Sequence, residues 1–191
     1  SVMALRLTAV FAWLVLKQLD RVEILTLRDG RPGKKNAVTG RGSFQRILKE
    51  LEQVEFGGRT GISQAVKRCS LNGRGICIII SDFLDPEGID EAVRYLTFKK
   101  QEILLIQVLA EEEVDFSEEG TLALEDKETG EQVRVTVTRQ TTEVYKRALE
   151  RHNQALEKLA KRYNCAFQQI ISDEELEKVI FQTLNKKGIF G

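Results

Sequence analysis

The sequence feature that most constrains the fold is an uninterrupted apolar run at residues 76–80, which Gly75 precedes and Ser81 follows. A strand with one face in water alternates apolar and polar residues, and this run shows no alternation. A second run, residues 103–109, has the same apolar character. Both strands therefore need cover on both faces, which is typical of the interior of a parallel sheet.

Strand and helix patterns alternate along the rest of the chain. Residues 121–138 alternate apolar and polar side chains around Gly130, which predicts a half-exposed β-hairpin. Strands are also predicted at residues 22–27 and 166–171, and helices at residues 2–16, 43–54, 60–69, 87–99, 141–163 and 173–186. Ser43 is the expected N-cap of its helix. The expected inward positions of the long helix are Val144, Ala148, Ala155 and Leu159.

This order predicts one α/β domain over residues 1–191. Its sheet is expected to be mainly parallel, with helices on both faces and the hairpin as an insertion. The four sheet strands are expected at residues 22–27, 75–81, 103–109 and 166–171. A length of 191 residues fits a single domain.

Cysteine and histidine usage narrows the classes of site. Three cysteines, with no Cys-x-x-Cys spacing, argue against a disulfide framework or a cysteine zinc site and favour a reducing cytoplasm. The lone histidine, His152, excludes a His-rich metal site and is expected at the edge of the core. The apolar stretch at residues 2–16 is too short for a membrane span and lacks the flanks of a signal peptide. We therefore expect a cytoplasmic protein.

Charge is balanced overall but divided along the chain. The chain has 29 basic and 29 acidic side chains, yet residues 1–75 carry 14 basic and 6 acidic ones, and the remainder is correspondingly acidic. The basic cluster lies at residues 28–41, and the acidic cluster lies at residues 111–119. The two clusters are either solvated loops or a bipolar surface that steers a partner protein. The basic segment at residues 28–41 has almost no interleaved aromatic residues, so we expect no nucleic-acid partner.

Functional residues are expected at the carboxyl ends of the strands, where open α/β sheets collect their sites. Asp82 directly follows the most apolar strand, where a carboxylate holds metal or phosphate or simply caps a turn. Thr60 follows two glycines and is either a site residue or the N-cap of a helix. The chain has no P-loop, no G-x-G-x-x-G fingerprint and no G-x-S-x-G elbow.

Four segments occur in an order that resembles a known family: LDRV (19–22), GRT (58–60), IISDFLDP (79–86) and DKETGE (126–131). They look like the carboxyl-terminal part of the bacterial proteins called domain of unknown function 58. The resemblance implies a von Willebrand factor A-like, Rossmann-like fold and an association with MoxR-type AAA+ ATPases.

The resemblance also implies a metal-ion-dependent adhesion site, in which three loops hold Mg²⁺. Thr60 would be the ligand from the second loop and Asp82 the ligand from the third. The Asp-x-Ser-x-Ser motif of the first loop is missing from this sequence. Mg²⁺ is thus expected in an intact domain, and no well-coordinated ion is expected in this chain, because two oxygen ligands rarely hold Mg²⁺.

Two functions from different classes remain open. The leading hypothesis is a non-enzymatic interaction domain that binds a protein partner, such as a MoxR-type ATPase, through the face bearing Thr60 and Asp82. The alternative is a Mg²⁺-dependent phosphotransfer or hydrolase domain that uses Asp82 and Asp85 as paired carboxylates.

By the same resemblance, the chain is a fragment without the first strand, which lies between the strands at residues 22–27 and 75–81. An empty position there would forfeit the burial of several apolar side chains, at about 1.5–3 kcal/mol each. We expect those two strands to pair directly or chains to associate, with a homodimer slightly favoured.

Overall fold

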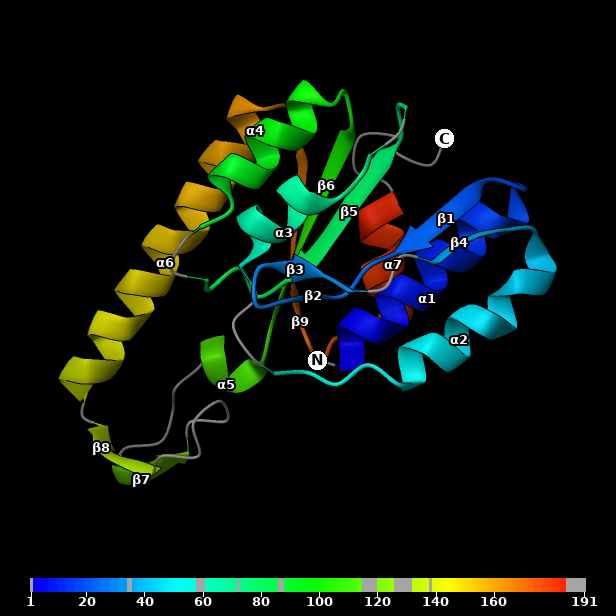
Figure 1. The fold of residues 1–191 in the computed structure, drawn as a ribbon. Helices are drawn as coiled ribbons and strands as arrows, with labels where there is room; N and C mark the ends of the chain where they lie inside the picture. Colours follow the sequence, from blue (N-terminus) through cyan, green and yellow to red (C-terminus); the bar gives the residue numbers. More distant parts are fainter. Residues whose placement is uncertain are drawn as a thin grey trace.

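The protein is described by a computed structural model that covers residues 2–33, 36–57, 61–71, 73–85, 88–114, 120–125, 132–137 and 139–184. Its centre is a parallel sheet of three strands in the order β5 (Ile76–Ser81), β6 (Glu102–Leu109) and β9 (Ala166–Ile171) (Figure 1). Ile80 is the register partner of Ile106, which in turn faces Gln168. The two apolar runs are therefore strands of one parallel sheet, as predicted, and the structure places them next to each other.

Helices cover both faces of this sheet, as the absence of alternation in β5 and β6 requires. On one face α1 (Val2–Lys17) and α7 (Leu176–Leu184) pack against Leu104, Ile106 and Ile170. On the other face lie α3 (Ile62–Arg68), α4 (Asp90–Phe98) and α6 (Arg139–Arg162), as Figure 1 shows. α2 (Phe44–Glu52) packs on the side of α1 that faces away from the sheet.

The strand predicted at residues 22–27 does not join the parallel sheet, which corrects the four-stranded prediction. β1 (Arg21–Ile24) pairs antiparallel with β4 (Asn36–Thr39), and β2 (Leu27–Arg28) pairs with β3 (Arg31–Pro32). The physical reason is the turn between β2 and β3, where Asp29 and Gly30 both have positive φ, 49° and 65°. An Asp-Gly pair with positive φ at both residues is typical of a two-residue hairpin turn.

The structure also shows no pairing between the segment at residues 22–27 and β5. The two segments belong to separate sheets. One of the two expected routes for closing the sheet is therefore wrong, while chain association stays a prediction.

The inserted hairpin is confirmed as β7 (Gly120–Glu125) and β8 (Gln132–Val137), with Leu124 opposite Val133. Gly130 and the rest of the connecting loop lie outside the described residues. The acidic cluster before it contains α5 (Glu111–Val114), a short helix that the sequence did not predict.

Of two local predictions about helices, the one on the inward face of α6 is wrong. Val144, Ala148 and Ala155 on α6 are exposed, and the buried positions are Leu149, Leu156, Leu159 and Ala160. Leucines bury more apolar area than alanines and so determine which face of the helix turns inward. Ser43 occupies the N-cap position of α2, as predicted, and also ends the short 3₁₀ helix η1 (Arg41–Ser43). Its hydroxyl donates to the Thr39 carbonyl at 2.7 Å and makes no cap hydrogen bond to α2.

Within the described residues, no helix combines the length and apolarity that crossing a membrane requires.

Candidate functional site at the carboxyl end of β5

The turn that follows β5 presents the Asp82 carboxylate to solvent. Asp82 Oδ1 accepts a hydrogen bond from the Leu84 N–H at 3.1 Å, and the Ser81 hydroxyl lies 3.3 Å away as a second donor. The Phe83 N–H donates to Ser81 Oγ at 3.1 Å. Asp82 is exposed, and Leu84 beside it is 42% exposed. The turn therefore orients one carboxylate and one apolar side chain outward.

Phe83 holds this turn in an unusual backbone conformation. Its φ is 59°, in the left-handed region that costs a non-glycine residue about 1–2 kcal/mol. Its side chain is 2% exposed and belongs to the core beneath α3, α4 and α6. Burial of an aromatic side chain contributes about 1.5–3 kcal/mol, which offsets the strain. The buried ring thus fixes the direction in which Asp82 and Leu84 point.

Gln107 supports the same turn from inside the protein. This residue of β6 is fully buried, and its Nε2 donates to the Asp82 carbonyl at 3.0 Å and to Asn153 Oδ1 of α6 at 3.1 Å. Its Oε1 is buried with no hydrogen-bond partner among the described residues. Gln107 is the one polar residue of the run at residues 103–109, and that break in the apolar pattern is the only signal of it in the sequence.

Asp85, unlike Asp82, is bound to another part of the chain. Its Oδ2 accepts a hydrogen bond from the Gly61 N–H at 2.7 Å, at the start of α3. Gly61 has a φ of 55°, and a Cβ there would lie 2.7 Å from the Gly30 Cα. Nearby, the Ser63 hydroxyl donates to the Gly88 carbonyl at 3.1 Å. Asp85 is half-buried and fastens the turn to α3, while Asp82 faces water.

Thr60, the other predicted metal ligand, lies outside the described residues. Among the described residues no group of three His, Cys, Asp or Glu side chains is placed to hold a metal ion. At the turn, Asp82 supplies one carboxylate and Ser81 one hydroxyl, while Asp85 Oδ2 already accepts a backbone N–H. Mg²⁺ takes six oxygen ligands in near-octahedral geometry, so these described donors do not by themselves form its site.

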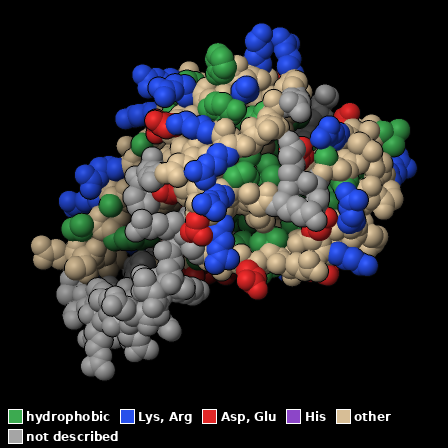
Figure 2. Space-filling view, viewed as in Figure 1, with side chains coloured by type: hydrophobic (Ala, Val, Ile, Leu, Met, Phe, Trp, Pro, Cys, Tyr) green, Lys and Arg blue, Asp and Glu red, His purple; other side chains and the backbone are tan. Residues whose placement is uncertain are grey.

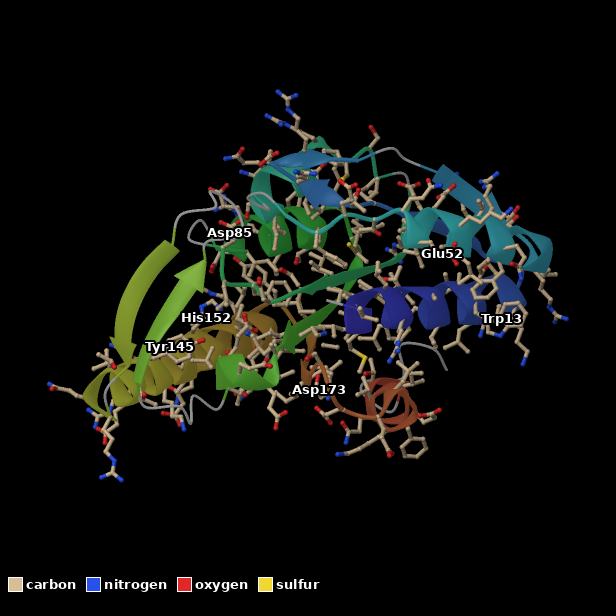
Figure 3. All side chains as sticks on the ribbon, turned by 90° about the horizontal axis from the view of Figure 1, so that it is seen from below. Trp13, Glu52, Asp85, Tyr145, His152 and Asp173 are labelled. Carbon is tan, nitrogen blue, oxygen red and sulfur yellow. The ribbon has the colours of Figure 1, made fainter. Side chains whose placement is uncertain are left out.

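His152 lies on α6 at the same end of the molecule as Asp85 and Tyr145 (Figure 3). It is half-buried, at the edge of the core, and its Nε2 is buried without a hydrogen-bond partner in the described part of the chain. The three side chains line a pocket of about 480 Å³, together with Leu149, Leu156 and Ile89. Burial raises the pKa of Tyr145, and the Glu113 carboxylate adds to this effect. The pocket walls are mostly apolar.

Three comparisons relate this chain to known proteins. A family model described as "Protein of unknown function DUF58" matches residues 1–155. No curated protein matches the sequence significantly.

Two solved structures share the fold. The conserved hypothetical protein BatB from Bacteroides thetaiotaomicron superposes with a TM-score of 0.54 at 17% identity, over 95% of this chain and 87% of that one. An aerotolerance-related membrane protein from Bacteroides fragilis, crystallised with multiple mutations to serine, gives a TM-score of 0.52 at 15% identity, over 96% and 87%. At these identities the likeness shows the fold alone.

Proposed function

Because this chain belongs to the DUF58 family of proteins of unknown function, we propose its role from the geometry of the Asp82 turn: it is a non-enzymatic interaction domain that binds a protein partner. One observation carries the proposal. Asp82 and Leu84 both face solvent on a turn that Gln107 and the buried Phe83 ring hold in place. A fixed carboxylate next to an exposed leucine suits recognition of a basic and apolar surface, because little side-chain freedom is lost on binding.

The sequence resemblance extends this proposal. It implies a von Willebrand factor A-like fold and a MoxR-type AAA+ ATPase as the partner, while the cysteine usage favours a cytoplasmic location. It also implies that the Asp82 turn is the remnant of a metal-ion-dependent adhesion site. Mg²⁺, where held by Asp82 and Thr60 with further oxygen ligands, would supply a positive centre for a partner's carboxylate.

The partner proposal is tested by binding of the purified chain to a MoxR-type ATPase from the same genome. Asp82→Ala and Leu84→Ala are each expected to weaken binding at least tenfold, about 1.4 kcal/mol. Asp20→Ala is the matched control, since Asp20 is an exposed aspartate in the turn after α1. Equal affinities for all three variants and the unmodified chain would contradict the proposal.

Calorimetry with Mg²⁺ and Mn²⁺ tests the metal separately. We expect no micromolar affinity for this chain, because the motif of the first loop is missing from its sequence. Micromolar binding that Asp82→Ala abolishes would show that the remaining ligands suffice.

The alternative function, a Mg²⁺-dependent enzyme, requires that Asp82 and Asp85 act together as paired carboxylates. Paired acid and base chemistry needs both carboxyl groups at the substrate, and Asp85 Oδ2 already accepts the Gly61 N–H. A screen for Mg²⁺-dependent phosphatase and nucleotidase activity separates the two functions. Turnover that is lost in both Asp82→Asn and Asp85→Asn would favour the enzyme.

A further inference from the structure

The pocket of about 480 Å³ that contains His152 is a groove along α6, which we name the α6 groove. One wall is α6 from Tyr145 to Leu159, a length of about 21 Å at 1.5 Å per residue. The other wall is the connection that follows β5, where residues 83–85 and 88–90 line the groove. Figure 3 shows Tyr145 and His152 following each other along α6. The groove therefore adjoins the Asp82 turn and continues along one side of a long helix.

α6 has two apolar faces, and the core covers only one of them. The buried residues of the covered face are Leu149, Leu156, Leu159 and Ala160. The second face contains Val144, Ala148 and Ala155, which are all exposed, and the two alanines line the α6 groove. Leu84, 42% exposed, lines the opposite wall. In Figure 2 apolar side chains are visible among the basic ones at the left of the molecule, where α6 lies.

The exposed face accounts for the wrong prediction about α6. The sequence pattern marked Val144, Ala148 and Ala155 as an apolar stripe that needs cover, and the fold leaves this stripe facing solvent. A contiguous apolar surface in a hollow is typical of an interaction site. The stripe therefore points to a partner outside the described chain.

The two rims of the α6 groove carry opposite charge. Asp90 is exposed on one rim, and the Asp82 carboxylate lies on the adjoining turn. Residues 81–90 contain no lysine or arginine. On α6, Arg151 lies three residues after one groove alanine and four before the other, so it belongs to the same side of the helix. Arg151 and Lys158, one heptad further along, are both exposed.

These walls determine the kind of occupant. None of the described residues that line the groove belongs to a strand, so an extended segment would find no sheet edge to pair with. A helix satisfies its own backbone groups and presents apolar side chains along one stripe. The opposite charges of the two rims favour a helix with basic residues along one border of its stripe and acidic residues along the other.

We propose that the α6 groove docks one amphipathic helix of a partner protein, with basic side chains towards Asp90 and acidic side chains towards Arg151. The apolar stripe of that helix packs between Leu84 and the two groove alanines of α6. This inference deepens the proposed function and rests on it, because Leu84 belongs both to the Asp82 turn and to the groove.

A synthetic peptide tests the groove without the natural partner. The probe is a helix of about fifteen residues, the length of the α6 wall, stapled so that little conformational entropy is lost on binding. It has leucines at i, i+4, i+7 and i+11, lysines along one border of this stripe and glutamates along the other. A second peptide has lysines along both borders.

The single histidine of the chain reports on occupancy. His152 lines the α6 groove, so its ring proton signals in NMR need no further assignment. We expect these signals to shift in a saturable way as the probe is added.

Two variants of neighbouring residues on α6 assign the binding to the groove. Ala155→Glu places a carboxylate in the apolar stripe and should weaken probe binding at least tenfold. Gln154→Glu is the matched control, since Gln154 is exposed and does not line the groove. Both variants add the same charge to the same helix, so neither the fold nor the net charge distinguishes them.

Charge reversal tests the complementarity of the rims. Arg151→Glu makes both rims acidic and should weaken binding of the probe at least fivefold in either orientation of the peptide. The peptide with two lysine borders should bind this variant better than it binds the unmodified chain. Equal behaviour of the two peptides towards both proteins would contradict the assigned charge pattern.

Three further outcomes would overturn the proposal. The first is the absence of any shift of the His152 signals at peptide concentrations up to about 1 mM. The second is equal affinity of Ala155→Glu and Gln154→Glu for the probe. The third is a shift of the His152 signals with protein concentration alone, which would identify a second copy of this chain as the occupant.

Binding of the MoxR-type ATPase distinguishes this inference from the proposed function. If Asp82→Ala weakens that binding and Ala155→Glu does not, the groove inference fails and the proposed function stands. If Asp82→Ala and Leu84→Ala both leave it unchanged, the proposed function fails, whatever the peptides do.

Discussion

β5 and β6 have similar apolar sequences and lie side by side, yet their environments differ. Every residue of β6 from Ile103 to Leu109 is buried, whereas in β5 only Ile79 is, and Ile76 is 42% exposed. Helices cover both faces of both strands, so the difference arises at the edges. β6 has a strand on each side, whereas among the described strands β5 pairs only with β6, and its other edge borders a groove of about 1310 Å³. An apolar run thus predicts cover above and below a strand but not the number of its neighbours.

The largest loss in the free energy of unfolding is expected from a charge placed inside β6. Gln107→Glu would set a carboxylate against two acceptors, the Asp82 carbonyl and Asn153 Oδ1. An unpaired buried charge costs about 3–5 kcal/mol, a large share of a typical domain's stability. Ile76→Glu on β5 should cost less than about 1 kcal/mol, because that side chain already reaches water.

Urea unfolding at several pH values checks this pair of variants. The new carboxyl should have a folded-state pKa above its unfolded value, so its penalty is present at neutral pH and is relieved as pH falls through the folded-state pKa. Gln107→Leu is the control without charge and should be less harmful than Gln107→Glu at pH 7. Equal stability of Gln107→Glu and the unmodified protein at pH 7 would show that water reaches the interior of β6.

The second test truncates an isoleucine in each of β5 and β6, at two positions that are register partners. Ile106→Ala should cost about 2–5 kcal/mol, because Ile106 is fully buried. Ile80→Ala, at its register partner, should cost less than half as much, because Ile80 is only half-buried. Urea midpoints with unchanged m-values give both numbers. Equal losses would mean that the edge of β5 is as enclosed as β6.

The third test uses Cys77, which lines the groove. Burial raises the pKa of its thiol to about 12, and Cys69 nearby adds to the shift. The thiolate is the reactive form, so iodoacetamide should modify Cys77 at pH 8 at least tenfold more slowly than in the unfolded chain. Because the folded-state pKa is the higher one, this thiol should also reduce stability as pH rises from about 9 towards 12.

Mass spectrometry of the alkylated peptides distinguishes Cys77 from Cys69 and from the buried Cys165. Rapid modification of Cys77 in the folded protein would show that the groove is wider and wetter than its lining indicates.

The smallest change in stability is expected from breaking an ion pair on the surface of the helices that cover β5. Lys67 of α3 forms a hydrogen-bonded ion pair with Glu91 of α4, which lowers the pKa of Glu91. Both side chains are solvent-exposed, so Lys67→Met should change the urea midpoint within experimental error at pH 7. The pair's small contribution is present above the ordinary carboxyl pKa and is lost as pH falls through the lowered value.

Glu91→Gln is the control for this pair and should behave like Lys67→Met at pH 7. A clearly lower urea midpoint in either variant would show that the contact between α3 and α4 contributes more to the stability of the protein than an exposed ion pair does.

The sequence predicted those parts of the fold that follow from local periodicity. The runs at residues 76–80 and 103–109 indicated strands of a parallel sheet covered on both faces, and the alternation at residues 121–138 indicated the hairpin. The antiparallel pairing of β1 was missed because Val22 and Ile24 have the same apolar pattern whichever strand they join. The Asp29-Gly30 pair was the available signal, since it marks a tight hairpin turn.

Of the two predicted site residues, Thr60 lies outside the described residues, and Asp82 lies on the turn after β5, where its place after an apolar strand put it. The different environment of Asp85 could not be foreseen, because it depends on the Gly61 N–H, 24 residues earlier in the chain. The role of Gln107 was equally hidden. A lone glutamine in an apolar strand shows that something polar is nearby, but not which turn it holds.

The close approach of Gly61 to Gly30 determines how the β2–β3 hairpin packs on α3. A Cβ on Gly61 would lie 2.7 Å from the Gly30 Cα and 2.8 Å from its nitrogen, so two stretches of main chain meet here without intervening side chains. No rotamer change can loosen such a joint. Gly30 lies in the turn between β2 and β3, and Gly61 lies at the start of α3. Any side chain at Gly61 would push the β2–β3 hairpin away from α3, so a pair of glycines sets how closely these two elements pack.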